Sequence, residues 1–273
     1  MINQKATLIF QKQLYDYYRE HGRHDLPWRQ PEADGSFDAY KIMVSEVMLQ
    51  QTQVFRVIPK FTDFIRLFPT IDSLAKAELG AVLRTWSGLG YNRRAKFLHQ
   101  AARQIRQDYM GNVPQDPEEL VRLPGIGPNT AAAIVVYSFN QPMIFIETNI
   151  RTVFIHHFFP GRTAVTDKAI LEIVQTTLDH DNPRTWYWSL MDYGTYLKQT
   201  VGNLNKASKS YAKQSTFHGS RRQIRGRIIR VLGERTQSQT ALAKLIDDDR
   251  FPDILQELLS EGLVHKERTR FSL

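Results

Sequence analysis

Apolar residues recur at intervals of three and four along most of the first 190 positions, a spacing that places them on one face of a helix. The segments IPKFTDFIRLF (58–68) and LHQAARQIRQDY (98–109) show this spacing, and Pro and Gly residues separate such segments from one another. An alternating strand pattern is not evident in this part of the chain. We therefore predict a mainly α-helical domain over residues 1–197.

A polar, basic stretch rich in Ser, Asn, Gly and Lys follows at 198–219 and is typical of a linker or an extended arm. Helical spacing returns in three segments after Ser220, and VHKERTRFSL (264–273) fits a short two-stranded wing. Three helices and a hairpin in so short a stretch predict a winged-helix-like module over 220–273. A helical appendage that only packs on the main domain is the alternative.

The net charge of +8 comes from one stretch of the sequence. Between Tyr193 and Gly233 there are nine Lys and Arg residues and no Asp or Glu, so the other 27 basic residues are nearly balanced by the 28 acidic ones. A local basic patch of this kind is typical of a surface that meets phosphate groups. A solvated basic linker is the alternative explanation.

Composition excludes several classes of protein and site. The chain has no cysteine, which excludes disulfides, thiolate nucleophiles and zinc or iron–sulfur clusters held by cysteine. No apolar run approaches the roughly 18 residues of a membrane span, and the N-terminus lacks the pattern of a cleavable signal. We therefore expect a cytoplasmic protein that does not interact with membranes.

The segment DAYKIMVSEVMLQQTQVFRVIP (38–59) predicts a buried helix that Asp38 can cap. Residues 42–49 are apolar nearly all round, and Glu46 is the acid in their midst. Burying an unpaired carboxylate is costly, which favours its protonated form, and a protonated carboxyl can act as a general acid. The alternative is a thin polar stripe that Glu46 shares with Ser45 and Gln50.

A glycine-containing turn is predicted within LPGIGPNTAAAIVVYSF (123–139). A helix should end near Arg122, and Pro128 suits the first position of the next helix. Glycines at 125 and 127 allow backbone N–H groups to approach a phosphate at the positive end of that helix. This is a helix-hairpin-helix pattern, which contacts the DNA backbone without distinguishing base sequence.

Glu147 follows a short apolar stretch and precedes a predicted helix from Asn149. A carboxylate just before a helix N-terminus is stabilised in its charged form. Glu46 and Glu147 would then occupy environments that move their pKa values apart, as acid and base partners do. Simple helix capping is the alternative role for Glu147.

Several motifs, in order and at matching intervals, resemble those of the helix-hairpin-helix (HhH-GPD) DNA glycosylases over about residues 8–195. SEVMLQQT is similar to the MutY-like adenine glycosylase branch and differs from the endonuclease III branch, which lacks the Glu. The motifs are LPW (26–28), SEVMLQQTQV (45–54), GLGY (88–91), LPGIGPNTA (123–131) and NIRTV (149–153).

The resemblance implies a two-lobed helical domain that flips a nucleotide out of double-stranded DNA. Glu46 would protonate the departing adenine at N7 and then assist the water, and Glu147 would stabilise the sugar cation. The resemblance also assigns binding residues to groups. The base pocket would be lined by Leu26, Trp28 and Val54, and the gap in the duplex would be plugged by Gln50, Gln51, Leu89 and Tyr91. The loop of Glu147 would be oriented by Asn149. The DNA backbone would be held by Gly125, Ile126 and Gly127 together with a bound monovalent cation, and phosphates would be contacted by Lys206, Lys209, Lys213, Arg221 and Arg222.

The chain departs from the family pattern at several points. Glu147 stands where the family usually has Asp, and a shift near 1 Å in a reacting group costs on the order of a hundredfold in rate. Asn129 stands where bifunctional relatives carry a lysine nucleophile, so we expect a monofunctional enzyme in which Asn129 binds the substrate. Asn92 replaces the second aromatic of GLGYY. The segment after Ser220 is too short and of another type to match the C-terminal domain with which typical adenine glycosylases bind 8-oxoguanine, so we do not expect that domain here.

We therefore predict a monomeric, cofactor-free adenine glycosylase acting on adenine opposite guanine or 8-oxoguanine. A thymine or uracil mismatch glycosylase is the alternative within the class. A non-catalytic DNA-binding module that kept the fold is the alternative outside it. A transcription factor that uses the C-terminal wing would leave the acid pair and the hairpin without a role.

Overall fold

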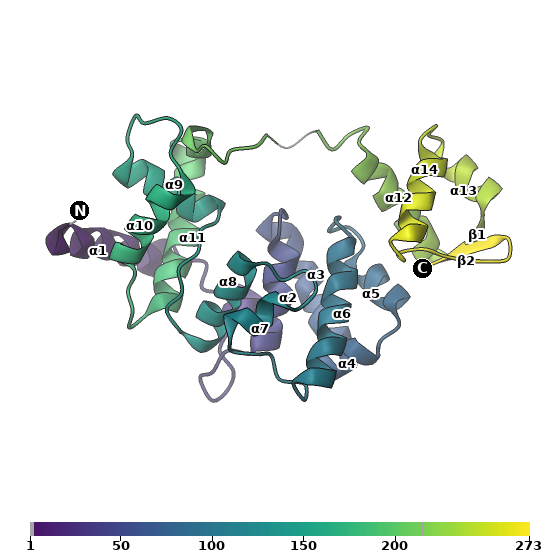
Figure 1. The fold of residues 1–273 in the computed structure, drawn as a ribbon, viewed down its shortest axis with the longest axis horizontal. Coiled ribbons are helices and arrows are strands. Elements are labelled where there is room, and N and C mark those ends of the chain that lie inside the picture. The colour runs from purple at the N-terminus through teal and green to yellow at the C-terminus, as the bar shows by residue number, and fades with distance from the viewer. Residues whose placement is uncertain (1–2, 214–215) are drawn as a thin grey trace. The chain divides into compact units, whose positions relative to one another are not determined.

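The computed structural model describes residues 3–213 and 216–273 and is mainly helical, as predicted (Figure 1). Within these residues, no helix combines the length and the apolar character that crossing a membrane requires. The helices up to the hairpin are α1 (Gln4–His21), η1 (Pro27–Arg29), α2 (Ala39–Leu49), α3 (Val54–Leu67), α4 (Ile71–Lys76), α5 (Leu79–Trp86), α6 (Arg93–Asp108) and α7 (Pro117–Val121). The later helices are α8 (Pro128–Phe139), α9 (Thr148–Phe158), α10 (Asp167–Thr177), α11 (Pro183–Thr200), η2 (Leu204–Ala207), α12 (Arg221–Glu234), α13 (Gln239–Ile246) and α14 (Phe251–Ser260).

The chain divides into two compact units, in line with the two-lobed prediction. Both units combine segments that are distant in sequence, and helix α2 begins in one and ends in the other. The predicted domains, separated by a linker at 198–219, are consecutive in sequence, unlike these two units. Whether they are independent domains stays a prediction. Unit 1 contains Met1–Ile42, Gln115–Val121 and Gly127–Lys213; unit 2 contains Met43–Pro114, Arg122–Ile126 and Gln214–Leu273.

The core of unit 1 forms where helices α1, α9, α10 and α11 pack together with α8. Residues 131–138 of α8 are all buried, which explains why this helix is apolar on every side. Aromatic side chains fill the rest: Phe10 meets Phe154 edge to face at 5.6 Å between ring centroids, and Phe145 stacks on Tyr187 at 4.2 Å. The buried face of α9 therefore packs against this core.

A buried ion cluster joins α11 to the turn after α1 within unit 1. Asp192 accepts hydrogen bonds from the backbone N–H of Arg23 at 2.8 Å and from the guanidinium of Arg29 at 2.8 Å. Burial alone would raise the pKa of Asp192, but the hydrogen bonds and charges of the two arginines outweigh burial and lower it. This cluster fixes the η1 segment, in which Leu26 and Trp28 are buried.

Unit 2 packs α3, α4, α5 and α6 around a second core. Phe64, Trp86 and Leu98 are fully buried there, with the rings of Phe64 and Trp86 at 6.2 Å and nearly perpendicular. Thr70 caps α4 through a capping box with Ser73, which sets the start of that helix.

The C-terminal module contains the three predicted helices and the predicted wing. Its strands are β1 (Gln237–Ser238), β2 (His265–Glu267) and β3 (Arg270–Ser272), which form an antiparallel sheet in the order β1-β3-β2. The short β1, which the sequence pattern did not predict, pairs with β3 through Gln237 and Phe271. Helix α12 packs against α5 within unit 2, so the module is part of that compact unit.

The structure differs from an extended arm in the first half of segment 198–219. Helix α11 continues to Thr200, and the buried Asn205 donates from its amide to Thr152 Oγ1 at 2.7 Å. The N–H of Lys209 donates to the carbonyl oxygen of Val165 at 2.9 Å. The polar residues of this stretch therefore bind α9 and the loop before α10, and residues 214–215 lie outside the described residues.

Candidate active site

Glu46 is half-buried near the C-terminal end of α2 and is the only acid of that helix. Its neighbours Val44, Val47 and Met48 are at most 1% exposed, as predicted for a helix apolar nearly all round. Ser45 is fully buried, so it does not form a solvated polar stripe with Glu46. The carboxyl thus projects from an apolar helix and is partly reachable, which suits proton transfer to a bound group.

Arg94 of α6 holds the end of α2, although the sequence did not single it out. Its buried guanidinium supplies five hydrogen bonds, three of them to carbonyl groups at the negative end of α2 and just beyond it. Burial lowers the pKa of Arg94 to about 10, so it remains charged at neutral pH. The acceptors are the carbonyl oxygens of Val47 (2.9 Å), Met48 (2.9 Å), Gln50 (2.5 Å) and Gly90 (3.2 Å), and Thr52 Oγ1 (3.0 Å).

Two loops that Arg94 joins present the predicted plug residues of unit 2. Gln51 and Tyr91 have φ angles of 53° and 49°, a left-handed backbone that is unusual for residues other than glycine. Both side chains are exposed, whereas Leu89 is 3% exposed. The backbone is therefore strained at the two residues whose side chains these loops expose, Gln51 and Tyr91, and such strain is often found at functional sites. Leu89 is buried and packs beneath its loop, so it is not presented as a plug residue.

The predicted hairpin between α7 and α8 is confirmed. Gly125 has a φ of 79°, and a Cβ there would lie 2.8 Å from that of Phe97, so only glycine fits. Ile126 is buried and donates its N–H to the carbonyl of Leu123 at 3.2 Å, while Gly127 is exposed and precedes Pro128 at the start of α8. The exposed turn and the positive helix end suit a phosphate. A monovalent cation at the hairpin stays a prediction.

Glu147 is the N-cap of α9, in unit 1. Its Oε1 accepts hydrogen bonds from the N–H groups of Asn149 at 2.5 Å and Ile150 at 2.9 Å. We predicted that this position favours the charged form, but burial raises the pKa of Glu147 and outweighs these donors and the charge of Lys198. The expectation of a lowered pKa for Glu147 was therefore wrong, because pattern alone did not reveal that this half-buried residue loses enough solvent to outweigh its hydrogen bonds.

Lys198 of α11 is a further site residue, which no sequence motif indicates. Its Nζ donates to Asn149 Oδ1 at 2.6 Å, and burial lowers its pKa while the charge of Glu147 opposes that effect. Gly194 makes this approach of α11 possible, because a Cβ there would lie 2.7 Å from that of Asn149. Gly194 and Lys198 are four residues apart and so lie on one face of α11. This spacing is the feature of the sequence from which a close approach of that face to the site could have been predicted.

The remaining predicted base-pocket residues fall in both units. Leu26 and Trp28 are 4% and 5% exposed in unit 1, and half-buried Val54 begins α3 in unit 2. Asn129 is exposed and donates from its amide to the carbonyl of Ile146 at 2.9 Å, which ties the start of α8 to the segment before Glu147. Asn129 therefore has a structural role in positioning that segment.

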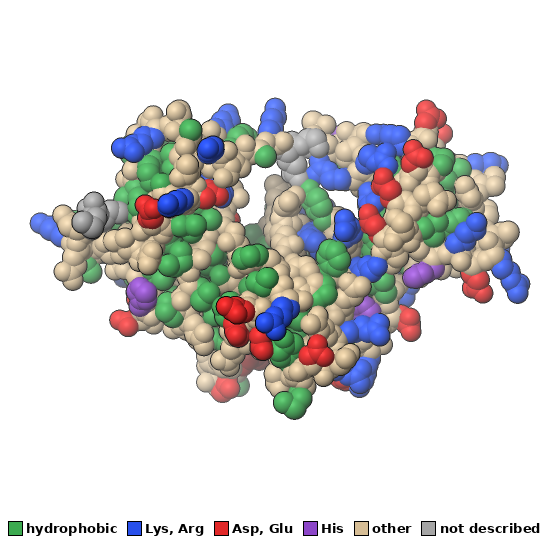
Figure 2. Space-filling model, in the orientation of Figure 1, with side chains coloured by type: hydrophobic (Ala, Val, Ile, Leu, Met, Phe, Trp, Pro, Cys, Tyr) green, Lys and Arg blue, Asp and Glu red, His purple; other side chains and the backbone are tan. Residues whose placement is uncertain are grey.

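The predicted phosphate-binding residues are exposed or half-buried. Lys206, Lys209 and Lys213 are exposed in unit 1. In the C-terminal module, Arg221 forms an ion pair with Glu257 at 2.6 Å, and Arg222 donates to the hydroxyl of Tyr91 at 2.7 Å. Lys and Arg side chains gather over α12, with acidic side chains beside them (Figure 2). The described residues hold no group of three or more His, Asp or Glu suited to a metal ion.

Residues 44–177, which include both acids and the hairpin, match the family described as HhH-GPD superfamily base excision DNA repair protein. The chain is 32% identical to the adenine DNA glycosylase of Mycolicibacterium smegmatis, over 93% of this chain and 92% of that protein. It is 31% identical to that of Mycobacterium tuberculosis, over 91% of this chain and 87% of that protein. It is 33% identical to that of Buchnera aphidicola subsp. Baizongia pistaciae, over 78% of this chain and 61% of that protein.

Solved structures show the same fold. A thermostable thymine-DNA glycosylase superposes with a TM-score of 0.60 and 25% identity, over 70% of this chain and 86% of that one. A trapped endonuclease III–DNA covalent intermediate also gives a TM-score of 0.60, over 72% of this chain and 88% of that one, at 16% identity. The second likeness concerns the fold alone.

Proposed function

Because the chain belongs to the HhH-GPD superfamily of base excision DNA repair proteins, we propose that it is a monofunctional DNA glycosylase that releases adenine opposite guanine or 8-oxoguanine. The observation that carries the proposal is Glu46, the one acid of α2, which is partly reachable although its neighbours in the helix are buried. The relatives called adenine DNA glycosylase, which match along nine-tenths of this chain, support adenine as the base.

The proposed reaction breaks the bond between C1′ of the deoxyribose and N9 of a flipped-out adenine. The bonding electron pair leaves with the base, which takes a proton from Glu46 at N7. Glu147, as a carboxylate, stabilises the positive charge left on the sugar. Water then attacks C1′ and gives a proton to the Glu46 carboxylate, which restores the enzyme. This chain has no cysteine, so the reaction does not involve a cluster held by cysteine.

The other residues bind and position the DNA in this proposal. Leu26, Trp28 and Val54 contact the flipped base, and Gln51 and Tyr91 enter the space that it leaves. Gln50, whose amide donates to the carbonyl of Gly125 at 3.4 Å, links the plug to the hairpin within unit 2. Gly125, Ile126 and Gly127 hold the backbone, and the exposed phosphate-binding residues are Lys206, Lys209, Lys213, Arg221 and Arg222.

A panel of duplexes tests the proposal. We expect the protein to produce alkali-labile sites at adenine opposite guanine and opposite 8-oxoguanine. We expect no covalent adduct on treatment with borohydride, because Asn129 carries no amine that could form a Schiff base. Thymine opposite guanine is the second candidate substrate, which the similarity to a thymine-DNA glycosylase supports. Release of thymine alone, or of no base from any duplex, would contradict the adenine assignment, and a robust adduct would contradict the monofunctional one.

Lys198 is expected to position the loop of Glu147 and to keep its carboxylate charged. The substitution Lys198→Met should slow base release about tenfold at neutral pH, through loss of the hydrogen bond from a charged group. It should also move the acid side of the pH–rate profile to higher pH, because the charge of Lys198 lowers the pKa of Glu147. Lys198→Arg, which keeps the charge, should leave that side near its original position. An unchanged profile in Lys198→Met would refute this role.

A further inference from the structure

Helix α12 contains a glycine that the packing of the protein does not require. Gly226 lies in the interior of this helix, where glycine is less favourable than alanine. Apart from its chain neighbours and the backbone of α12 itself, no atom of the described residues lies within 4 Å of the position that a Cβ would occupy, so packing against other elements does not exclude a larger residue. One use of glycine is to let a ligand approach the backbone closely.

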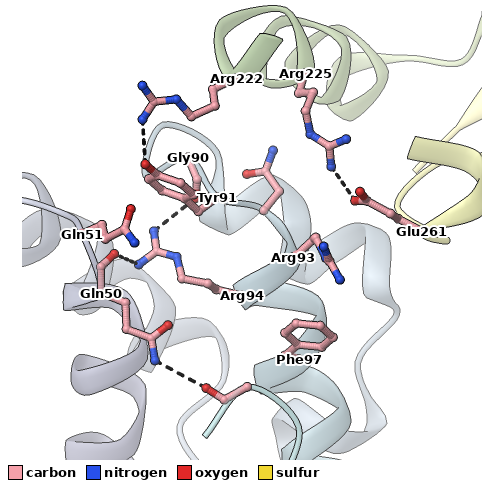
Figure 3. Close-up of a pocket in the computed structure, with 13 residues that line it drawn as sticks. Gln50, Gln51, Gly90, Tyr91, Arg93, Arg94, Phe97, Arg222, Arg225 and Glu261 are labelled. Carbon is pink, nitrogen blue, oxygen red and sulfur yellow. Dashed lines mark hydrogen bonds and ion pairs between the residues drawn. The ribbon is translucent and has the colours of Figure 1, made fainter. Parts of the chain in front are cut away.

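Gly226 is one of the residues that line a cavity of about 580 Å³ within unit 2, a volume in the range of small-molecule sites. Figure 3 shows this cavity. Arg222 and Arg225 reach it from α12, whereas Tyr91 and Phe97 belong to the opposite side. A second hollow, of about 470 Å³, shares Tyr91, Arg222 and Gly226 with the first. The contact between Tyr91 and Arg222 therefore lies where the two hollows meet.

The chemistry of the walls suits a nucleobase. The Arg222 guanidinium lies 5.7 Å from the centre of the Tyr91 ring, and that of Arg93 lies 5.5 Å from the centre of the Phe97 ring. Aromatic faces and guanidinium planes are the surfaces on which unstacked bases are bound. Basic side chains also outnumber acidic ones here, since Glu261 is the only acid of the lining and is paired with Arg225.

Hydrogen bonds also link the walls to one another. Arg94 joins the end of α2 to the loop of Tyr91, so the two protein segments beside the cavity are fixed to each other. Lys96 of α6 donates to the carbonyl of Glu261, which ties the C-terminal module to the same frame. A prearranged site loses less conformational entropy when a ligand binds.

We propose that this cavity binds one unstacked nucleobase of the DNA strand that faces the excised base, with α12 as one wall. This proposal rests on the proposed function, because the cavity would lie near the opposite strand only if Gln51 and Tyr91 insert into a DNA duplex. Gly226 leaves room for the base against the helix backbone, and Arg222 contacts its ring. The winged-helix-like module thereby takes part in binding the opposite strand.

The test measures binding of the full chain to two duplexes by fluorescence anisotropy. Both carry a tetrahydrofuran abasic-site analogue, opposite either guanine or a second tetrahydrofuran. The wild type should bind the guanine duplex about tenfold more tightly, as stacking of one base on an aromatic ring provides. Gly226→Leu, which fills the cavity and favours the helix, should reduce this ratio below twofold, and Gly226→Ala should have a smaller effect.

Lys244→Met is the matched control for charge, because Lys244 is exposed on α13 of the same module and does not line either hollow. It should keep the tenfold ratio, whereas Arg222→Met should reduce it below threefold even if Gly226→Leu fails to fold. A wild-type ratio near one, or a tenfold ratio in folded Gly226→Leu and in Arg222→Met, would overturn the proposal. The assay measures no base release, so a failure of the proposed glycosylase activity would be seen separately, in the duplex panel.

Discussion

Replacement of Glu46 by glutamine is expected to slow adenine release by about a thousandfold, the scale on which a general acid contributes. Glutamine has nearly the same size and shape as glutamate, so the apolar packing of α2 should be preserved. It cannot donate the proton that the departing base requires, and it cannot accept one from water afterwards. Single-turnover release from a duplex with adenine opposite 8-oxoguanine, scored by alkaline cleavage, measures the effect.

The control is that Glu46→Gln should bind a duplex with an abasic-site analogue within about twofold of the wild type, since phosphate contacts supply most of the affinity. Glu78→Gln makes the same chemical change at an exposed position of unit 2 and should retain the wild-type rate. A Glu46→Gln variant with the wild-type rate would remove the acid assignment. Loss of binding together with loss of rate would point instead to a damaged fold.

Replacement of Glu147 by glutamine should slow base release by a factor of a hundred to a thousand, as expected for the loss of one electrostatic partner of the transition state. A glutamine oxygen can still accept the two N–H groups at the start of α9, so the helix cap should survive. What is lost is the negative charge that faces the sugar cation. Glu147→Asp keeps that charge at a shorter reach and should be faster than Glu147→Gln.

The pH dependence separates charge from capping. Burial raises the pKa of Glu147 above the ordinary 4.5, so protonation on the acid side should remove its charge at a higher pH than for an exposed glutamate. The rate should therefore fall as the pH drops through that raised pKa, and this fall should be absent in Glu147→Gln. Glu172→Gln, an exposed change on α10 of the same unit, is the control and should keep the fall. An acid side that persists in Glu147→Gln would show that another group causes it.

Local features of the sequence determined most of the secondary structure and the position of both acids. The helical spacing of apolar residues, the glycine turn before Pro128 and the short C-terminal wing all appear in the structure. Glu46 on its apolar helix and Glu147 immediately before α9 were also found from the chain alone. These features depend on interactions between residues a few positions apart, which a sequence displays directly.

Only the tertiary structure decided which distant groups meet. Arg94 and Arg93 are adjacent and chemically identical, yet only Arg94 is buried against α2, some 45 positions earlier in the chain. The contacts of Lys198 with Asn149 and of Arg222 with Tyr91 likewise join residues 49 and 131 positions apart. The raised pKa of Glu147 and the open space beside Gly226 arise in the same way. Burial and cavity shape depend on how helices from different parts of the chain pack, and no local pattern contains that information.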